Sequence, residues 1–160
     1  HNQSRRQRQM CIRDRDIIGR GGAKLKDQWE TGAKSYLGLG IANFPNLFTV
    51  TGPGSPSVLS NMMPSIEQHV NWITDCIDWM ETNDKKVIES SKTAEDEWMV
   101  LVNEIADMTI FTDTKSWYNG SNIDTKAKAF LPFIGVPVYA EMLEEVVTDD
   151  YKGFIFDRPN

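Results

Sequence analysis

Cysteine is scarce in this chain, and its scarcity excludes two classes of protein. Cys11 and Cys76 are the two cysteines among 160 residues, too few for a disulfide scaffold and too isolated for a zinc site. The sequence also lacks an apolar run long enough to span a bilayer and lacks a secretory signal. We therefore expect a protein of a reducing cytoplasm, without a membrane partner.

Two glycine motifs that would indicate a familiar chemistry are absent as well. The segments GRGG at residues 19–22 and GLG at residues 38–40 fail the spacing of the dinucleotide fingerprint G-x-G-x-x-G. The segment GSPS at residues 54–57 does not fit the G-x-S-x-G elbow of serine hydrolases. The residues therefore give no support to a complete dinucleotide-binding motif or to a serine nucleophile.

Positive charge is concentrated at the start of the chain and sparse elsewhere. Residues 1–15 hold five arginines and one acidic residue, whereas the remainder holds 12 basic and 22 acidic residues, a net charge of −10. An arginine-rich arm could bind nucleic acid, but the acidic remainder opposes such a surface. We interpret residues 1–15 as a scar of sequence assembly, because residues 10–15 back-translate into the end of a sequencing adapter.

The most informative segment spans residues 44–72. Its apolar run around Phe48 ends in a turn of glycine and proline, and a helical pattern follows at once. A strand, a tight turn and a helix start in this order suit a negatively polarised ligand, because free backbone N–H groups and the positive end of the helix dipole face it. On the residues alone, a capped turn without a ligand is the simpler interpretation.

Apolar spacing predicts three longer helices, at residues 60–81, 93–109 and 139–147. The first carries two apolar stripes, so we expect it to be buried on two sides, as in a domain larger than this chain. Thr93 is predicted to cap the second helix. Strands are expected at residues 35–41, 44–51 and 151–156, an extended buried segment at residues 130–136, and a polar connector at residues 83–92.

Three stretches carry a resemblance to a known family: residues 29–39 (WETGAKSYLGL), residues 44–72 and residues 116–120 (SWYNG). Together with their surroundings, residues 16–156 resemble the C-terminal part of type I Baeyer–Villiger monooxygenases, such as phenylacetone and cyclohexanone monooxygenases. The resemblance implies an α/β fold with two Rossmann-like domains, one for FAD and one for NADP. Residues 16–160 would form the C-terminal portion of the FAD-binding domain, with the following helices and a mobile loop.

The resemblance also implies an activity for which this chain holds part of the machinery. Members of the family use FAD, NADPH and O2 to convert ketones into esters or lactones. Their fingerprint F-x-G-x-x-x-H-x-x-x-W and their catalytic arginine lie upstream of the matched segment, so no catalytic residue is assigned here. We expect the chain to be inactive by itself and to require the N-terminal part of the same enzyme.

By position, the resemblance assigns binding roles to ten residues. The helix start near residue 61 would face the pyrimidine edge of the flavin, where its dipole stabilises negative charge on reduction. Trp117 matches a tryptophan of the loop that closes over NADP. The implied cofactor residues are Gly52, Pro53, Gly54, Asn61, Met62 and Trp117, and the implied ketone pocket is lined by Ser57, Val58, Leu59 and Ser60.

Two other sets of polar residues could suggest chemistry, and we interpret both as structural. His69 titrates near neutrality, but it lies between Trp72 and Cys76 on an inward helix face, where a packed, hydrogen-bonded histidine is expected. The acidic residues 95–97 and the glutamates of residues 141–145 are interpreted as solvated helix faces.

Two alternative functions stay open. An N- or S-oxygenating flavin monooxygenase would share the strand and the turn, and the upstream fingerprint would separate it from a ketone-oxidising enzyme. A stand-alone, non-catalytic binding domain would fold as a cooperative monomer with a closed core, whereas a fragment would expose apolar helix faces.

Overall fold

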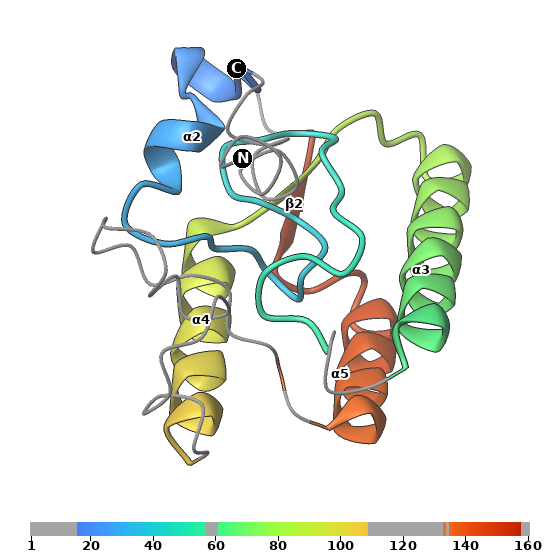
Figure 1. Ribbon diagram of the computed structural model, residues 1–160. Coiled ribbons are helices and arrows are strands. Elements are labelled where there is room, and N and C mark those ends of the chain that lie inside the picture. Colours follow the sequence, from blue (N-terminus) through green and yellow to red (C-terminus); the bar gives the residue numbers. More distant parts are fainter. Residues whose placement is uncertain (1–15, 57–60, 109–132, 134, 158–160) are drawn as a thin grey trace, which may run out of the picture.

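A computed structural model describes residues 16–56, 61–108, 133 and 135–157. In chain order its elements are η1 (Arg20–Gly22), α2 (Leu25–Gln28), α3 (Met62–Thr82), β1 (Ile88–Ser90), α4 (Lys92–Asp107), α5 (Val136–Thr148) and β2 (Phe154–Phe156). In Figure 1 the three long helices, α3, α4 and α5, stand around a central segment, residues 35–56, that has little regular structure.

The three long helices confirm the helical periodicity, with ends shifted by a few residues. Asn61 caps α3, since its side chain accepts a hydrogen bond from the second amide of the helix at 3.2 Å. Ser91 caps α4 in the same way, accepting from the N–H of Ala94 at 3.1 Å. The prediction that Thr93 caps this helix is therefore wrong, because Ser91 already satisfies the free amide of the first turn.

A two-stranded antiparallel sheet joins β1 to β2, with Glu89 opposite Ile155. All three residues of β1 are buried, and Glu89 forms an ion pair with Arg20. The prediction of a polar connector at residues 83–92 is wrong here, because a three-residue strand with one apolar side chain gives no periodic signal. The predicted terminal strand at residues 151–156 is confirmed in its last three residues.

The predicted strands at residues 35–41 and 44–51 are wrong for the described structure, which has isolated bridges there instead. Leu37 and Gly38 have positive φ values of 58° and 73°, so the chain reverses within the first predicted strand. In the second, Phe48 makes a single bridge. A strand is stable only when a partner pairs with it along its length, and the apolar pattern alone does not reveal that partner.

The core lies where the three helices meet the central segment. Trp98 stacks on Phe133 with ring centroids 5.1 Å apart, and Trp72 meets Tyr151 edge to face at 5.3 Å. Such aromatic contacts stabilise the core beyond the stabilisation that comes from burying their apolar area. Other fully packed members of this cluster are Leu37, Leu39, Cys76, Val102, Tyr139 and Leu143.

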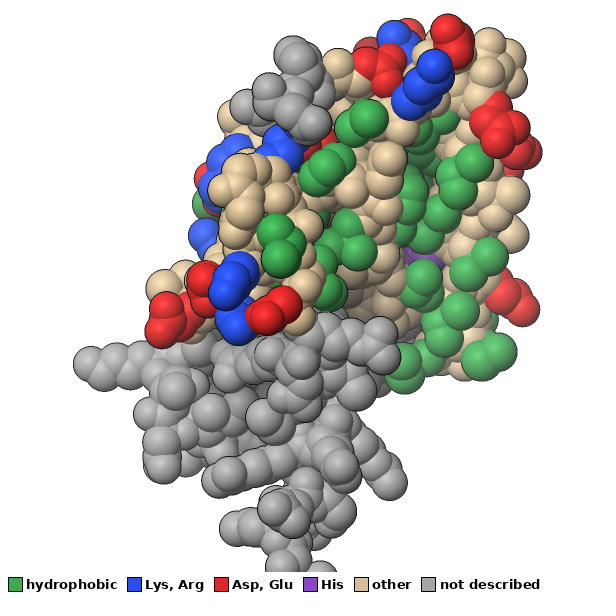
Figure 2. Space-filling model, turned by 90° about the horizontal axis from the view of Figure 1, so that it is seen from above, with side chains coloured by type: hydrophobic (Ala, Val, Ile, Leu, Met, Phe, Trp, Pro, Cys, Tyr) green, Lys and Arg blue, Asp and Glu red, His purple; other side chains and the backbone are tan. Residues whose placement is uncertain are grey.

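Helix α3 buries one of its two apolar stripes within this chain and leaves much of the other exposed, as expected of a fragment; burial of the second stripe in a larger domain stays a prediction. Val70 and Ile77 on the second stripe keep 47% and 43% of their surface exposed. Figure 2 shows hydrophobic side chains gathered on the side of the molecule where α3 lies. Steps of three and four residues are typical of a helix that packs along a second helix. We call this stripe the α3 seam; it consists of Met63, Ile66, Val70, Ile73 and Ile77.

We expect the chain alone to self-associate through the α3 seam, because contiguous exposed apolar surface promotes association. Replacing both Val70→Lys and Ile77→Lys should shift the chain toward the monomer in sedimentation velocity. The matched control places two lysines at Asn71 and Thr74, exposed polar positions of the same helix, and should leave self-association unchanged. A wild-type chain that stays monomeric as its concentration rises would contradict this expectation and favour a stand-alone domain.

Candidate functional site

The turn at residues 52–56 is packed on all sides. Each of its residues is buried. The hydroxyl of Ser35 donates to the carbonyl oxygen of Pro53 at 2.6 Å, and the N–H of Phe133 donates to the carbonyl oxygen of Ser55 at 3.2 Å. The turn is therefore fixed by the chain itself, between Ser35 and Phe133.

Close packing accounts for the two glycines of this turn. A Cβ on Gly52 would lie 2.6 Å from the carbonyl oxygen of Gly38, and one on Gly54 would lie 2.9 Å from Nε1 of Trp98. Gly54 also has a φ of 78°, in the left-handed region that favours glycine. Both glycines are thus required by contacts within the chain, and their contact with a cofactor stays a prediction.

His69 connects the turn to α5 through buried hydrogen bonds. Its Nδ1 accepts from the N–H of Thr51 at 3.0 Å, and its Nε2 lies 2.6 Å from the hydroxyl oxygen of Tyr139. The same hydroxyl lies 2.6 Å from the carbonyl oxygen of Leu37. Because a carbonyl oxygen only accepts, Tyr139 donates to Leu37 and His69 must donate from Nε2. The imidazole is therefore neutral, with its proton on Nε2.

Burial explains the protonation state of these groups. His69 is 0% exposed, and the loss of hydration that an imidazolium would suffer lowers its pKa to about 4. Burial also raises the pKa of Tyr139 well above its ordinary value. The prediction of a packed, hydrogen-bonded core histidine is confirmed. Its partner Tyr139 is 70 residues away, so no local pattern could have revealed the pair.

The start of α3 is the exposed part of the expected cofactor site. Asn61 and Met62 are exposed, and the first turn of the helix holds no acidic residue. No carboxylate of the first turn therefore offsets the positive end of the helix dipole, which suits a negatively polarised group. The other expected site residues, Ser57, Val58, Leu59, Ser60 and Trp117, lie outside the described residues.

Glu95 is buried, so the expectation that it belongs to a solvated face is wrong. Its side chain is 0% exposed; Oε1 accepts from the N–H of Ala42 at 3.0 Å, and Lys92 Nζ lies 3.5 Å from Oε2. Burial raises the pKa of this carboxyl, while Ala42 and Lys92 act in the opposite direction. Helical spacing contains the missed signal, since Glu95 shares a face with Trp98 and Val102. The solvated positions are confirmed for Asp96, Glu97, Glu141, Glu144 and Glu145.

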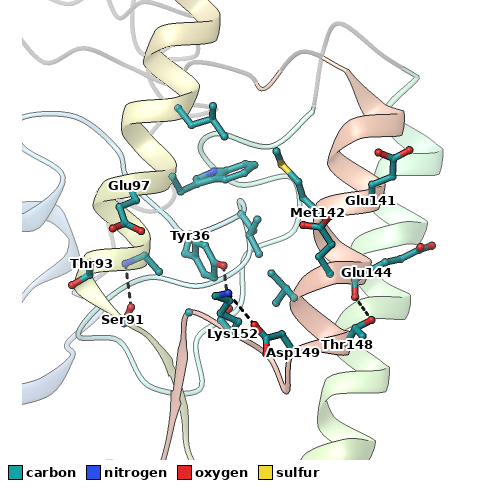
Figure 3. A pocket seen from close by; sticks show the side chains of 17 residues that line it. Tyr36, Ser91, Thr93, Glu97, Glu141, Met142, Glu144, Thr148, Asp149 and Lys152 are labelled. Carbon is teal, nitrogen blue, oxygen red and sulfur yellow. Dashed lines mark hydrogen bonds and ion pairs between the residues drawn. The ribbon is translucent and has the colours of Figure 1, made fainter.

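A cleft of about 1150 Å³ opens between α4 and α5. Figure 3 shows carboxylates on both of its sides, Glu97 from α4 and Glu141 and Glu144 from α5. Between them the hydroxyl of Tyr36 donates to the carbonyl oxygen of Lys152 at 3.0 Å. None of the expected cofactor residues within the described ranges lines this cleft.

Among the described residues, no group of three histidine, cysteine, aspartate or glutamate side chains is placed to hold a metal ion. In the same part of the chain, no helix combines the length and the apolar character needed to cross a membrane. Two described features that suit a ligand are the cleft and the exposed start of α3.

The fold is shared with solved flavoenzymes, although no protein-family model matches the chain. The chain superposes on a cyclohexanone monooxygenase from Rhodococcus sp. Phi1 bound to NADP+ with a TM-score of 0.86 and 39% identity, over 92% of this chain and 28% of that one. The fold class expected from the sequence, part of a flavin monooxygenase with two dinucleotide-binding domains, is confirmed.

The sequence relatives of this chain are also monooxygenases. A phenazine N-monooxygenase of Lysobacter antibioticus is 43% identical over 141 residues, which is 88% of this chain and 26% of the relative. A Baeyer–Villiger monooxygenase of Pseudooceanicola batsensis is 38% identical over 144 residues, which is 89% of this chain and 26% of the relative. The chain is a homologue of Baeyer–Villiger monooxygenases and spans about a quarter of the length of the relatives it matches.

We expect Tyr139→Phe to lower the free energy of unfolding by about 1–3 kcal/mol, because it leaves the Nε2 proton of His69 and the Leu37 carbonyl unpaired in the core. Tyr36→Phe is the matched control, since the bond from Tyr36 to Lys152 is exposed, and it should cost less than about 1 kcal/mol. Urea denaturation at a concentration where the chain is monomeric measures both losses. Equal losses would contradict the assignment of a buried polar chain.

Proposed function

We propose that this chain forms the C-terminal part of an FAD- and NADPH-dependent monooxygenase that converts ketones into esters or lactones with O2. The observation that carries the proposal is the exposed start of α3 behind a packed turn, in a chain whose fold matches an NADP+-bound cyclohexanone monooxygenase. The uncovered α3 seam supports the view that further parts of the enzyme pack on this one.

In the complete enzyme, the described residues would hold FAD at the turn and at the start of α3. Gly52, Pro53 and Gly54 would bring the backbone close to the cofactor, and Asn61 and Met62 would set the helix terminus against the pyrimidine edge of the flavin. The fit rests on the first turn of α3, where no carboxylate offsets the dipole, so that negative charge on the flavin is stabilised. When bound, FAD supplies the oxidation chemistry, with NADPH as the electron source.

The remaining roles fall on residues outside the described ranges. Ser57, Val58, Leu59 and Ser60 would line the ketone pocket, and Trp117 would close over NADP and that pocket. An indole offers a broad apolar face and one N–H donor, which suits a side chain that covers a cofactor. Covering the site in this way keeps water from the reacting atoms.

A second candidate reaction is oxygenation of a ring nitrogen. One observation favours it: the phenazine N-monooxygenase is 43% identical to this chain, compared with 38% for the Baeyer–Villiger enzyme of Pseudooceanicola batsensis. The two alignments cover nearly the same share of the chain, so overall similarity does not separate the two reactions. Ketone oxidation is the first choice because the solved structures that match the chain include cyclohexanone monooxygenases.

The partner that this proposal requires is the rest of the same polypeptide. We place the complete enzyme in the cytoplasm, in keeping with a free buried thiol at Cys76. A net charge of −6 for the whole chain is unfavourable for a nucleic-acid partner.

We expect the purified chain to consume no NADPH when it is supplied with FAD, O2 and a ketone. The reason is that it covers about a quarter of the length of its relatives and does not contain the remaining three quarters. A graft that replaces the matching part of the Rhodococcus cyclohexanone monooxygenase with residues 16–160 should bind FAD and release a lactone from cyclohexanone. Product analysis with cyclohexanone and with phenazine separates ketone oxidation from N-oxygenation. Steady, O2-dependent NADPH consumption by the chain alone would refute the fragment interpretation.

In the same graft, we expect Met63→Glu to weaken FAD binding roughly twofold to fivefold, because a carboxylate in the first turn of α3 competes with the flavin for the helix dipole. Met63→Gln is the matched control without charge and should bind FAD like the parent graft. Titration of flavin fluorescence measures both affinities. Indistinguishable affinities of the two variants would argue against contact between the flavin and this helix terminus.

A further inference from the structure

His69 reaches the turn of the proposed flavin site directly, although the proposed reaction does not use it. We propose that His69 is a positioning residue: it holds Thr51, and through it the turn and the start of α3, in the geometry that the flavin requires. It does so only as the neutral imidazole with its proton on Nε2. The link to the flavin rests on the proposed function, whereas the link to Thr51 rests on the described contacts.

Thr51 has the backbone conformation that needs to be held. Its φ is 52°, a left-handed value that a β-branched residue rarely adopts. Such a conformation persists where the surroundings fix it, and these positions often occur at functional sites. The N–H of Thr51 donates to Nδ1 of His69 at 3.0 Å. Because Thr51 directly precedes Gly52, its backbone angles determine the direction in which the chain enters the turn.

The hydrogen bonds around His69 have a single consistent set of roles. Tyr139 gives its only hydroxyl proton to Leu37, so its oxygen is left to accept from Nε2 of His69. Nδ1 is then the acceptor for Thr51. A second proton could be added only at Nδ1, where it would point at the N–H of Thr51. Two donors would then oppose each other, and the bond that holds the turn would be lost.

Within the part of the chain that the structure describes, the side chains that pack around His69 provide no counter-charge for an imidazolium, and burial is the cause of its lowered pKa. On α5 the titratable contact is Tyr139, and on the inward face of α3 the other titratable group is Cys76, whose pKa burial raises to about 12. Two further titratable groups have other hydrogen-bond partners than His69. On α4 the buried Glu95 accepts from the N–H of Ala42, and in the central segment the hydroxyl of Tyr36 donates to the backbone of residue 152. An added proton on His69 would therefore be uncompensated.

The direction of the pH dependence follows from the lowered pKa of His69, about 4 against an ordinary value of 6.5. The arrangement that holds Thr51 binds a proton less readily than an opened arrangement with the imidazole in water. The held arrangement therefore keeps its full advantage above pH 6.5. Between pH 6.5 and about pH 4, the ratio of the held to the opened population falls by up to about tenfold for each pH unit. A residue that only fills space would show no such dependence.

The test measures hydrogen exchange at the Thr51 amide in the grafted enzyme between pH 4 and pH 7.5, after correction for the intrinsic exchange rate. His69→Gln keeps one acceptor and one donor but does not titrate, whereas His69→Leu keeps neither. The amide of Thr49, which donates to the carbonyl oxygen of Leu39 at 2.8 Å, serves as the control amide. FAD affinity is measured on the same three proteins at pH 7.5.

We expect protection of the Thr51 amide in the parent graft to fall by up to about tenfold per pH unit below pH 6.5, with no matching change at Thr49. His69→Gln should protect Thr51 equally at every pH and bind FAD within about threefold of the parent. His69→Leu should lose protection of Thr51 at every pH and bind FAD at least about tenfold more weakly.

Two results would overturn the inference: protection of Thr51 that has the same pH profile in the parent and in His69→Gln, or parent-like protection and FAD affinity in His69→Leu. If His69→Leu does not fold, the comparison of the parent with His69→Gln decides by itself. A parent graft without FAD affinity would overturn the proposed function, and the exchange of the Thr51 amide would still decide whether His69 holds the turn.

Discussion

Three hydrogen bonds run through the apolar core from Leu37 to Tyr139, from Tyr139 to His69 and from His69 to Thr51. They begin and end in the central segment and pass through α5 and α3 on the way. Apolar packing tolerates many small shifts of one helix against another, whereas a buried polar group without its partner is costly. These bonds therefore select one placement of the central segment between the helices, and the turn at residues 52–56 depends on that placement.

Buried carboxylates fix the middle of the central segment. Glu95 accepts from the N–H of Ala42, and Glu89 accepts from the N–H of Asn43 at 3.3 Å. The two glutamates belong to α4 and β1, which follow each other in the chain, and they bind consecutive amides of one loop. Polar contacts thus hold the central segment near both of its ends and at its middle, and the aromatic and aliphatic core packs around it. Of the α3 seam, Ile73 packs against the edge of this core, whereas Met63, Val70 and Ile77 stay exposed.

Sequence reasoning was most successful where a signal is local or repeated. The helical period of α3 is a property of neighbouring residues, and the matched words around Trp29 and Trp117 are contiguous. The held conformation of Thr51 could not be predicted, since it depends on partners 18 and 70 residues apart in sequence. The strands expected in the central segment failed for a related reason, because pairing depends on a neighbour that the pattern of one strand does not specify. Glu95 is different: its position on the inner face of α4 was readable, but its charge was taken as a sign of exposure.

The distance in sequence between His69 and Tyr139 also determines the order in which this structure can form during synthesis. Ribosomes add roughly 5–20 residues per second, so His69 waits for several seconds, in order of magnitude, before residue 139 exists. Throughout that interval α3 can form its helix, but the imidazole of His69 has no hydroxyl to donate to. The carbonyl oxygen of Leu37 likewise has no donor. The emergence of α5 then completes the polar chain, and Tyr151 and β2, which follow α5 in sequence, close the aromatic core and the sheet after it.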